Sequence, residues 1–346
     1  MTLAELVASR VEEMGEYHGV STATSFGDSG AEWEALDSGV ALVDRSHRHI
    51  ISASGDERKE FLQGQISSQI EGGAQGEGRA GLLLSAQGRV QSILALYDRG
   101  ETIDLVVDED LRESTAERLE EFLVADDVEF DADDDAAPIQ IGIAGPKAQS
   151  LLTDAGVSTP TSPWGVSQGR IASIDVVVYA RGDLRVPVYE IAAADGAALW
   201  SAIEELGAVP CGYQAVETVR LESGTARFGV DVGSDRIAME ARLEWAIHFA
   251  KGCYVGQEVI ERAVSRGRLN RLLCLLEVEG VVPLGAHVEG AGEKDVVTSL
   301  ARSPKYGSIA LAYVDRERAV AGVHIHVGGV SARVLEWPRH EVLAGR

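Results

Sequence analysis

One cysteine in the chain lies in a setting that favours thiolate chemistry. Cys253 stands between two glycines, Gly252 and Gly256, and Lys251 comes two residues before it. A helix is predicted to begin at Gln257, and both a nearby ammonium group and a helix N-terminus lower the pKa of a thiol. We therefore predict a reactive thiol at Cys253, with Lys251 as its activating cation. The alternative is a buried turn cysteine without a chemical role.

Basic residues gather after this segment, against the acidic trend of the chain. Arg262 and Arg266 fall in the predicted helix, and Arg268 and Arg271 follow it. Clustered guanidinium groups are typical of a site for carboxylate or phosphate, so we predict that Arg262 and Arg266 bind an anionic ligand. The alternative is that these arginines pair with acidic groups on the surface.

Two other segments offer weaker chemistry. His47 and His49, like His324 and His326, lie on one face of a predicted strand, but no cysteine or carboxylate completes a ligand set nearby in sequence. We therefore predict no metal site. The glycine-rich stretch 72–81 lacks the Gly-Lys-Ser/Thr of a phosphate loop, and we predict a turn there.

The composition is that of an acidic globular chain. Its 346 residues include 55 Asp and Glu against 31 Lys and Arg, a formal net charge of −24, and 45% are hydrophobic. Only five of the basic residues are lysines, which we interpret as adaptation to a salt-rich cytoplasm that screens charge repulsion. This surface disfavours direct binding of nucleic acid, and no apolar run is long enough to span a membrane, so we expect a cytoplasmic protein. The remaining cysteines, Cys211 and Cys274, lie in apolar surroundings typical of inert core residues.

Apolar spacing and turn residues predict the elements that must position these groups. Residues 3–18 have the spacing of an amphipathic helix, and the acidic run 126–135 marks a boundary between domains. Beyond residue 268, short apolar segments separated by Gly, Pro and Asp predict an all-β terminal domain, a small barrel or sandwich. Because helices and antiparallel strands are segregated along the chain, the predicted fold class is α+β.

The segment around Cys253 resembles a known signature. Lys251-Gly252-Cys253-Tyr254-Val255-Gly256-Gln257-Glu258 is similar to the K-G-C-Y-x-G-Q-E motif of the YgfZ family of folate-binding proteins, which are relatives of the glycine-cleavage T-protein. The likeness covers nearly the whole chain from about residue 38, with further matches at residues 61–65, 87–90, 145–148, 220–224, 229–231 and 239–241.

The resemblance implies a three-domain cloverleaf with folate in a central cavity. Its parts would be a discontinuous folate-binding domain of residues 1–45 and 137–265, an inserted α+β domain of residues 46–136, and a C-terminal β-barrel-like domain of residues 266–346. It implies tetrahydrofolate or a derivative as ligand, allows a transient iron–sulfur cluster, and makes Cys253 the functional thiol. The implied role is assembly or repair of iron–sulfur clusters. The implied partners are iron–sulfur assembly proteins or client enzymes, such as tRNA-modifying methylthiotransferases.

Two positions of the T-protein pattern persist and two are lost. Glu190 and Tyr97 match folate-region residues: a carboxylate can accept the paired N–H donors of a pterin, and a tyrosine ring can stack on it. The catalytic aspartate of the T-protein corresponds to Ser92 or Ile93 here, and its folate-clamping arginine corresponds to Val216. Because that acid is missing, we expect an iron–sulfur factor; a tetrahydrofolate-dependent aminomethyltransferase or demethylase is the alternative.

Three smaller questions stay open at this point. Asp98, at the end of the same predicted strand, could substitute for the missing acid. Glu190 could instead be an ordinary acid at a strand end. A cysteine hydrolase would need a base near the thiol, where His248 is the only histidine close in sequence, and this class is disfavoured.

Overall fold

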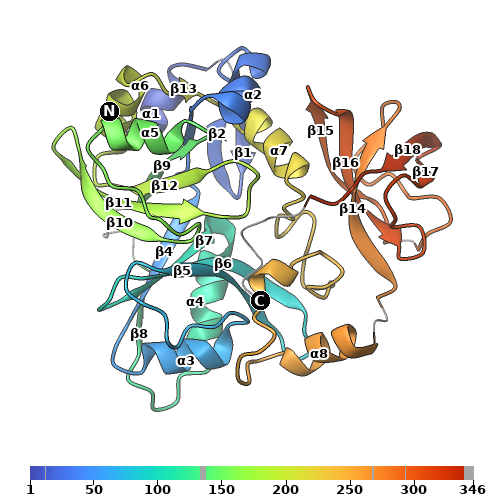
Figure 1. Ribbon diagram of the computed structural model, residues 1–346, viewed down its shortest axis with the longest axis horizontal. Helices are drawn as coiled ribbons and strands as arrows, with labels where there is room; N and C mark the ends of the chain where they lie inside the picture. Colours follow the sequence, from blue (N-terminus) through green and yellow to red (C-terminus); the bar gives the residue numbers. More distant parts are fainter. Residues whose placement is uncertain (12, 133–137, 267–268, 293, 339–346) are drawn as a thin grey trace.

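Three β-sheets and a separate hairpin form the frame of the protein, which a computed structural model describes at residues 1–11, 13–132, 138–266, 269–292 and 294–338. Figure 1 shows two of the sheets stacked on one side and the third, C-terminal sheet on the other. The helices are α1 (Leu3–Ala8), α2 (Ser29–Ser38), α3 (Arg58–Gln65), α4 (Arg112–Glu120), α5 (Ala148–Asp154), α6 (Gly196–Glu205), α7 (Tyr213–Glu222) and α8 (Gln257–Arg266), with short 3-10 helices η1 (Glu109–Leu111) and η2 (Glu244–Ala246). The predicted mixture of helices and antiparallel sheets is confirmed.

The first sheet has six strands drawn from distant parts of the chain. Its order is β10-β11-β12-β9-β3-β13, and all neighbours are antiparallel except β13 and β3. The early strand β3 therefore lies beside β9, which follows the entire second sheet in sequence. The strands are β3 (Ala41–Asp44), β9 (Ile139–Ala144), β10 (Val166–Ile171), β11 (Ile174–Arg181), β12 (Val188–Ala192) and β13 (Val209–Pro210).

The second sheet is built from the chain between β3 and β9. Its order is β5-β6-β7-β4-β8, all antiparallel, and apolar side chains of its buried face pack against α3 and α4. In Figure 1 this sheet lies directly below the first. Its strands are β4 (Arg48–Ser54), β5 (Gly78–Leu84), β6 (Val90–Asp98), β7 (Ile103–Asp108) and β8 (Glu129–Asp131).

The C-terminal sheet corrects the prediction of a barrel. Its order is β15-β16-β14-β18-β17, and within the described residues the edge strands β15 and β17 do not pair with each other. A barrel requires its first and last strands to close the hydrogen-bond ladder, so this sheet is open. Its strands are β14 (Arg271–Val278), β15 (Val297–Ser303), β16 (Gly307–Asp315), β17 (His324–Val327) and β18 (Val330–Val334).

The N-terminal prediction also needs a correction. The helix predicted over residues 3–18 ends after Ala8, and the chain then forms a hairpin of β1 (Met14–Tyr17) and β2 (Val20–Ala23). His18 and Gly19 have φ of 52° and 77°, the left-handed values of a tight hairpin turn that a helix cannot contain. The helical spacing of apolar residues was misleading here because Met14, which continues the apolar stripe of α1, packs on the first sheet from the base of the hairpin.

One apolar cluster joins the three sheets. It contains Tyr97 of the second sheet, Tyr179 of the first and Tyr313 of the C-terminal sheet, each at most 1% exposed. The sheets therefore share buried surface around a common centre. The three-domain boundaries given above stay a prediction, and the one at 136/137 lies outside the described residues together with residues 133–135 of the acidic run.

Candidate functional site

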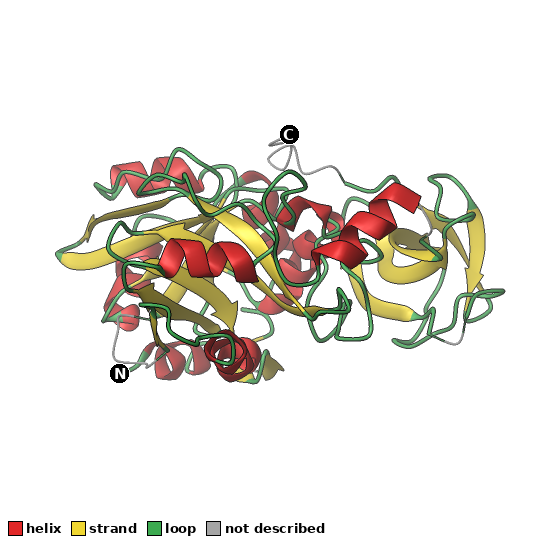
Figure 2. Ribbon diagram, turned by 90° about the horizontal axis from the view of Figure 1, so that it is seen from below, coloured by secondary structure: helices red, strands yellow, loops and turns green. Residues whose placement is uncertain are grey.

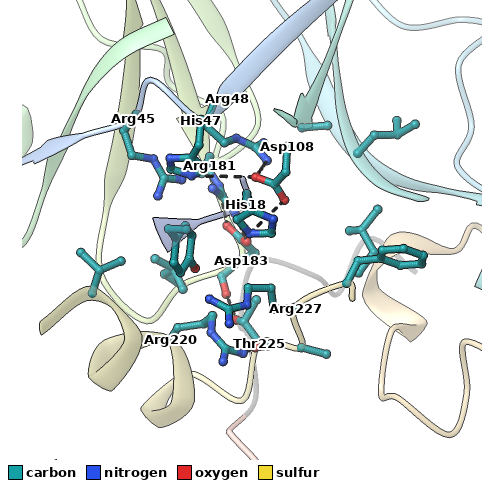
Figure 3. Close-up of a pocket in the computed structure, with 18 of the residues that line it drawn as sticks. His18, Arg45, His47, Arg48, Asp108, Arg181, Asp183, Arg220, Thr225 and Arg227 are labelled. Carbon is teal, nitrogen blue, oxygen red and sulfur yellow. Dashed lines mark hydrogen bonds and ion pairs between the residues drawn. The ribbon is translucent and has the colours of Figure 1, made fainter. Parts of the chain in front are cut away.

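A cavity of about 750 Å³, its open mouth included, lies where the two stacked sheets meet α7 and the loop after it. Its walls divide by chemistry (Figure 3). One part is charged, with Arg45, Arg48, Arg181, Arg220, Arg227, Asp108 and Asp183; another is aromatic or apolar, with Trp164, Trp245, Phe228, Ile93, Leu94, Ala95, Leu184, Val216 and Ala226. Five arginines in one cavity of so acidic a protein indicate a ligand with anionic groups.

The strands place the first arginines around a buried carboxylate. Glu190 is fully buried in β12, and its Oε1 accepts hydrogen bonds from Arg45 Nε at 3.0 Å and from Arg181 Nη1 at 2.9 Å, with Arg48 Nε 3.3 Å away. Arg45 can reach Glu190 because its side chain passes over Gly142, the register partner of Glu190 in β9, where a Cβ would come within 2.9 Å of the Arg45 Cγ. The backbone pattern therefore creates the space that this cluster needs.

Glu190 is ionised, but only one of its two carboxylate oxygens accepts hydrogen bonds. Burial by itself would raise the pKa of Glu190, but Arg48, Arg45 and Arg181 together hold it well below its ordinary value. Its second oxygen, Oε2, is buried and has no hydrogen-bond partner among the described residues. A buried carboxylate oxygen without a donor is unusual and marks a place where a ligand N–H could bind.

The second wall of charge centres on Asp108. Arg48 begins β4 and lies opposite Asp108 at the end of β7, which brings Arg48 Nη1 within 2.7 Å of Asp108 Oδ1. The other oxygen, Oδ2, lies 3.6 Å from His18 Nε2. Burial would raise the pKa of Asp108, but the guanidinium group of Arg48 holds it well below its ordinary value, so the cavity presents a permanent anion.

His47 adds a neutral imidazole to this wall. It is 3% exposed, its ring stacks on that of His18 with centroids 5.6 Å apart, and its Nδ1 lies 2.8 Å from the Tyr213 hydroxyl. Burial, helped by the adjacent Arg45, lowers the pKa of His47 well below 6.5, so the ring is uncharged at neutral pH. A neutral imidazole can accept or donate a hydrogen bond without adding charge.

The two arginines of the far wall differ in their freedom. Arg220 is fully engaged, with bonds to Glu217, Asp231, Ser299 and the Thr225 carbonyl. Arg227 instead lies over the Tyr17 ring at 4.5 Å, with its Nη1 3.4 Å from Glu217 Oε1, and its buried Nε has no hydrogen-bond partner among the described residues. Of these two arginines, Arg227 is therefore the one with an N–H donor available to a ligand.

Aromatic rings form the opposite side of the cavity. Trp164 and Trp245 lie nearly parallel, with centroids 6.1 Å apart and an angle of 11° between the ring planes. Trp164 precedes β10 and Trp245 lies in η2, so the pair joins two distant parts of the chain. Flat aromatic faces of this kind pack well against a planar ring of a ligand.

The residues predicted to bind folate lie behind the cavity wall. Glu190 contacts three lining arginines but does not itself line the cavity. Tyr97 is fully buried, its hydroxyl donates to the Ala180 carbonyl at 3.0 Å, and its ring packs edge-on against Tyr179. The structure thus places both in the layer that supports the cavity, and their folate contacts stay a prediction.

The positions that depart from the T-protein pattern lie in or beside the wall. Ile93 and Val216 both line the cavity, whereas Ser92 faces away and accepts a hydrogen bond from Thr115 at 3.1 Å. Asp98, considered as a substitute for the missing acid, pairs with Lys59 at 2.5 Å and does not line the cavity. Asp108 and Asp183 are the carboxylates that the described residues place in this wall.

The signature segment forms a rigid loop outside the cavity. The Lys251 ammonium group donates to the carbonyls of Gln63, Ile66 and Ser68 at 2.5–2.8 Å, and burial lowers the pKa of Lys251 to about 8. Its charge is therefore directed at backbone carbonyls at the end of α3 and in the segment that follows it. This arrangement explains the lysine as an anchor, which differs from the predicted role of activating the thiol.

The glycine at 256 lets this loop approach the second sheet. Gly256 has φ of +85°, and a Cβ there would lie 2.7 Å from the Ser85 carbonyl oxygen. Tyr254 is buried, its backbone N–H donates to Gln257 Oε1 at 3.2 Å, and Gln257 donates in turn to Glu261. Gly252 and Cys253 are exposed, so the loop holds a free thiol at the surface.

The predicted anion site after the signature is not assembled by the described residues. Helix α8 begins at Gln257 as predicted, but exposed Arg262 pairs with Glu258 of the same helix at 2.5 Å, as the alternative had it. The side chain of Arg266, like residue 268, lies outside the described residues. No signature residue lines the cavity, and neither does Arg262.

The cavity residues were missed because they come from separate segments. The sequence signal was charge at the ends of apolar strands: Arg45 follows β3, Asp108 ends β7, and Arg181 ends β11. A charged side chain at the end of an apolar strand is partly buried and needs a group of opposite charge close by. His47 and Arg48 were weighed only as part of a histidine pair for metal. Among the described residues no group of three metal-ligating side chains could hold an ion.

Comparisons with known proteins agree on one family. Residues 4–251 match the family model of the GCVT N-terminal domain. The chain is 30% identical to the aminomethyltransferase of Rubrobacter xylanophilus over 320 residues, covering 89% of this chain and 85% of that protein. It is 29% identical to the aminomethyltransferase of Streptomyces avermitilis, over 91% of this chain and 90% of that one.

A solved structure supports the same fold. The crystal structure of the glycine cleavage system aminomethyltransferase T of Bartonella henselae superimposes with a TM-score of 0.85, covering 98% of this chain and 97% of that chain at 21% identity. The chain therefore shares its overall fold with that protein over nearly its whole length. Within the described ranges, no helix has the length and apolar character needed to cross a membrane (helices are red in Figure 2).

Proposed function

The chain belongs to the family of the GCVT N-terminal domain, and on that premise we propose that it binds tetrahydrofolate in the arginine-lined cavity and transfers a one-carbon unit, as an aminomethyltransferase-like enzyme. The observation that carries the proposal is the double character of the cavity wall, aromatic on one side and cationic on the other. A folate has the matching parts: flat rings at one end and glutamate carboxylates at the other.

The unpartnered groups around the cavity fit such a ligand. Glu190 lies behind the cavity wall and its Oε2 lacks a donor, so we propose that N–H groups of a reduced pterin reach it between the lining arginines. A carboxylate offers the acceptors that Arg227 lacks, and a charge-assisted bond of this kind is typically worth about 1.5–3 kcal/mol. Trp164 and Trp245 offer a flat surface for an aryl ring. Tetrahydrofolate, when bound, supplies the ring nitrogens that carry the one-carbon unit.

We assign the electrostatic part of the reaction to Asp108. Transfer of a one-carbon unit between amines develops positive charge on the transferred group, and a fixed anion in a dry cavity stabilises such charge. Asp108 stays ionised beside Arg48 and has one oxygen free of strong bonds, which supports this role. His47, as a neutral ring nearby, can accept or return a proton.

The proposal is tested by binding and turnover in molar KCl without oxygen. Wild-type protein should bind tetrahydrofolate saturably, followed by tryptophan fluorescence, and should form a one-carbon product on it from an aminomethyl donor, quantified by mass spectrometry. Arg227→Met should weaken binding roughly ten- to a hundredfold because one charge-assisted bond is lost. Arg170→Met removes an equal charge from the exposed edge strand β10 and should change nothing. Absence of saturable binding by the wild type would overturn the proposal.

A second candidate function rests on the exposed Cys253. Its loop is anchored by Lys251 and Gly256, so the thiol is held at the surface at a fixed place, as suits a site that receives a partner protein or a transient iron–sulfur cluster. Deleting the gene separates the two candidates. Loss of iron–sulfur enzyme activities, restored by the wild type but not by Cys253→Ala, would favour the iron–sulfur role. Loss of one-carbon transfer, restored by both proteins, would favour the transferase.

A further inference from the structure

The β1–β2 hairpin covers part of the cavity without belonging to any of the three sheets. Within the part of the chain that the structure describes, its two strands pair only with each other, from Met14 opposite Ala23 to Tyr17 opposite Val20. A two-stranded hairpin is marginally stable by itself, so what fastens it to its neighbours decides whether it stays closed.

The base and the tip of the hairpin are fastened in different ways. At the base, Ala23 is buried and Met14 is partly buried in the apolar core of the first sheet. At the tip, Tyr17 and His18 line the cavity; Tyr17 stacks on Tyr213 with ring centroids 3.8 Å apart, and both tip residues also make polar contacts to carboxylates. Apolar packing is not lost by a small rotation about the base, whereas the polar contacts of the tip are released when the tip moves away.

The contacts of the tip bridge two parts of the protein. The Tyr17 hydroxyl donates to Glu217 Oε1 of α7 at 2.6 Å. His18 points towards the end of β7 (Figure 3), with Nδ1 3.0 Å from Asp110 Oδ1 and Nε2 3.6 Å from Asp108 Oδ2. The His18 side chain is only 5% exposed although it lies at the turn of a hairpin.

The backbone of the hairpin turn is strained at His18, and the contacts that His18 makes in the closed position offset this strain. His18 has φ of 52°, a left-handed conformation that a residue with a side chain adopts at some strain. Its imidazole is the group that gains from this conformation, because it reaches both aspartates and stacks on His47. The contacts of His18 therefore determine whether the tip stays down.

We propose that the β1–β2 hairpin is a lid over the cavity, hinged at Met14 and Ala23 and latched by His18 to Asp108 and Asp110. Opening exposes the cavity for exchange of ligand, and closing completes the wall and holds Asp108 in place. The proposal rests on the proposed function only for the identity of the ligand, since the movement can be measured on the protein alone.

Hydrogen exchange of the ligand-free protein tests the latch. The amides of residues 14–23 should exchange faster than those of the central strands β9 and β12, and His18→Ala should speed exchange of the hairpin roughly fivefold while leaving the sheets unchanged. Asp110→Asn should act in the same direction, because it removes the partner of His18 from outside the cavity. His18→Gln should restore part of the protection, and Ser21→Ala on the exposed face of β2 should have no effect. Hairpin amides that exchange as slowly as β9 and ignore both latch variants would overturn the lid.

Binding kinetics give the second readout. Stopped-flow mixing with tetrahydrofolate should show association and dissociation rates that both rise severalfold in Asp110→Asn, with the Kd changed less than about twofold, because a looser lid speeds passage both ways. A rise in the dissociation rate alone, with hairpin exchange unchanged, would make the tip a simple ligand contact and would overturn the lid. If the latch variants alter hydrogen exchange while wild-type protein binds no tetrahydrofolate, the lid stands and the proposed ligand falls.

Discussion

Ile93 and Asp108 line the same cavity from neighbouring strands. β6 and β7 pair antiparallel with Ala95 opposite Val106, and Ile93 and Asp108 each lie two residues beyond that pair. The position where the T-protein resemblance leads one to expect an acid is a hydrocarbon here, and an ionised carboxylate enters the cavity from the next strand.

Asp108→Asn should therefore abolish most of the transfer. Removing a preorganised charge from a reaction centre typically costs about 10²–10³ in kcat. Tetrahydrofolate affinity should change far less, because Asp108 is assigned to the reaction and not to binding. The double variant Ile93→Asp/Asp108→Asn should regain part of kcat, since a carboxylate again faces the cavity. The measurement is kcat and KM of the three proteins, with Glu113→Gln on the exposed face of α4 as control. Unchanged turnover in Asp108→Asn would remove it from the reaction.

Glu190→Gln should destabilise the whole protein. The substitution leaves three buried guanidinium groups without their shared anion, and breaking a buried pair in this way costs about 3–5 kcal/mol. Glu204→Gln is the matched control, because Glu204 pairs with Arg10 at the surface, where such a pair is worth about 1 kcal/mol or less. Urea unfolding in high salt measures both. Equal small losses for the two variants would mean that the cluster is hydrated and not buried.

Cys253 should be the thiol that alkylates first in the native protein. It is exposed, whereas Cys211 and Cys274 are buried and burial raises the pKa of both thiols, that of Cys274 to about 11. Mass spectrometry after limiting iodoacetamide measures the order. Preferential labelling of Cys211 or Cys274 would contradict the fold around them.

Lys251→Met should change stability more than thiol chemistry. The three carbonyls lose their common donor, at about 1–3 kcal/mol, while the ammonium group is directed away to the 63–68 segment. The alkylation rate of Cys253 should therefore fall less than twofold, and the unfolding midpoint should drop. A tenfold slower reaction at unchanged stability would restore Lys251 as the activating cation.

His47 should make stability depend on pH. Its pKa is lower in the folded protein than the ordinary 6.5, so the unfolded chain binds the extra proton between these values. The free energy of unfolding should then fall as pH drops below 6.5, by up to about 1.4 kcal/mol per pH unit. The difference between wild type and His47→Gln, measured at pH 7.5 and 5.5, isolates this contribution. The control is His287→Gln on the exposed surface, whose free energy of unfolding should change with pH as that of the wild type does. If the free energy of His47→Gln also changes in that way, the His47 ring is solvated and the explanation is wrong.

Local patterns in the sequence predict the local structure well and the cavity poorly. Helix α8 and the tight loop at Gly256 follow from spacing, turn residues and glycine, whereas β8 lies inside the acidic run 126–135 that the sequence marks only as a boundary. The cavity depends on pairings across the whole chain: Arg45, Asp108, Arg181 and Arg227 are brought together by sheet register. No local signal encodes those pairings.

The N-terminal error has the same origin. Met14 and Val11 fit a helical stripe, yet they pack on the first sheet from a hairpin, because tertiary packing selects among the conformations that the spacing allows. In the signature segment, a recognised motif does not by itself reveal what each of its residues contacts. The Lys251 ammonium group donates to the carbonyls of Gln63, Ile66 and Ser68, contacts that the motif by itself does not reveal.

The most direct measurement of the central claim is calorimetric titration of tetrahydrofolate into wild-type protein and two tryptophan variants. Leu184→Trp fills the cavity from its own wall, and Leu206→Trp adds the same ring at an exposed position after α6. The account predicts one site per chain in the wild type and in Leu206→Trp, with equal affinity, and no measurable binding in Leu184→Trp. Binding that survives in Leu184→Trp, or that is absent from the wild type, would contradict it.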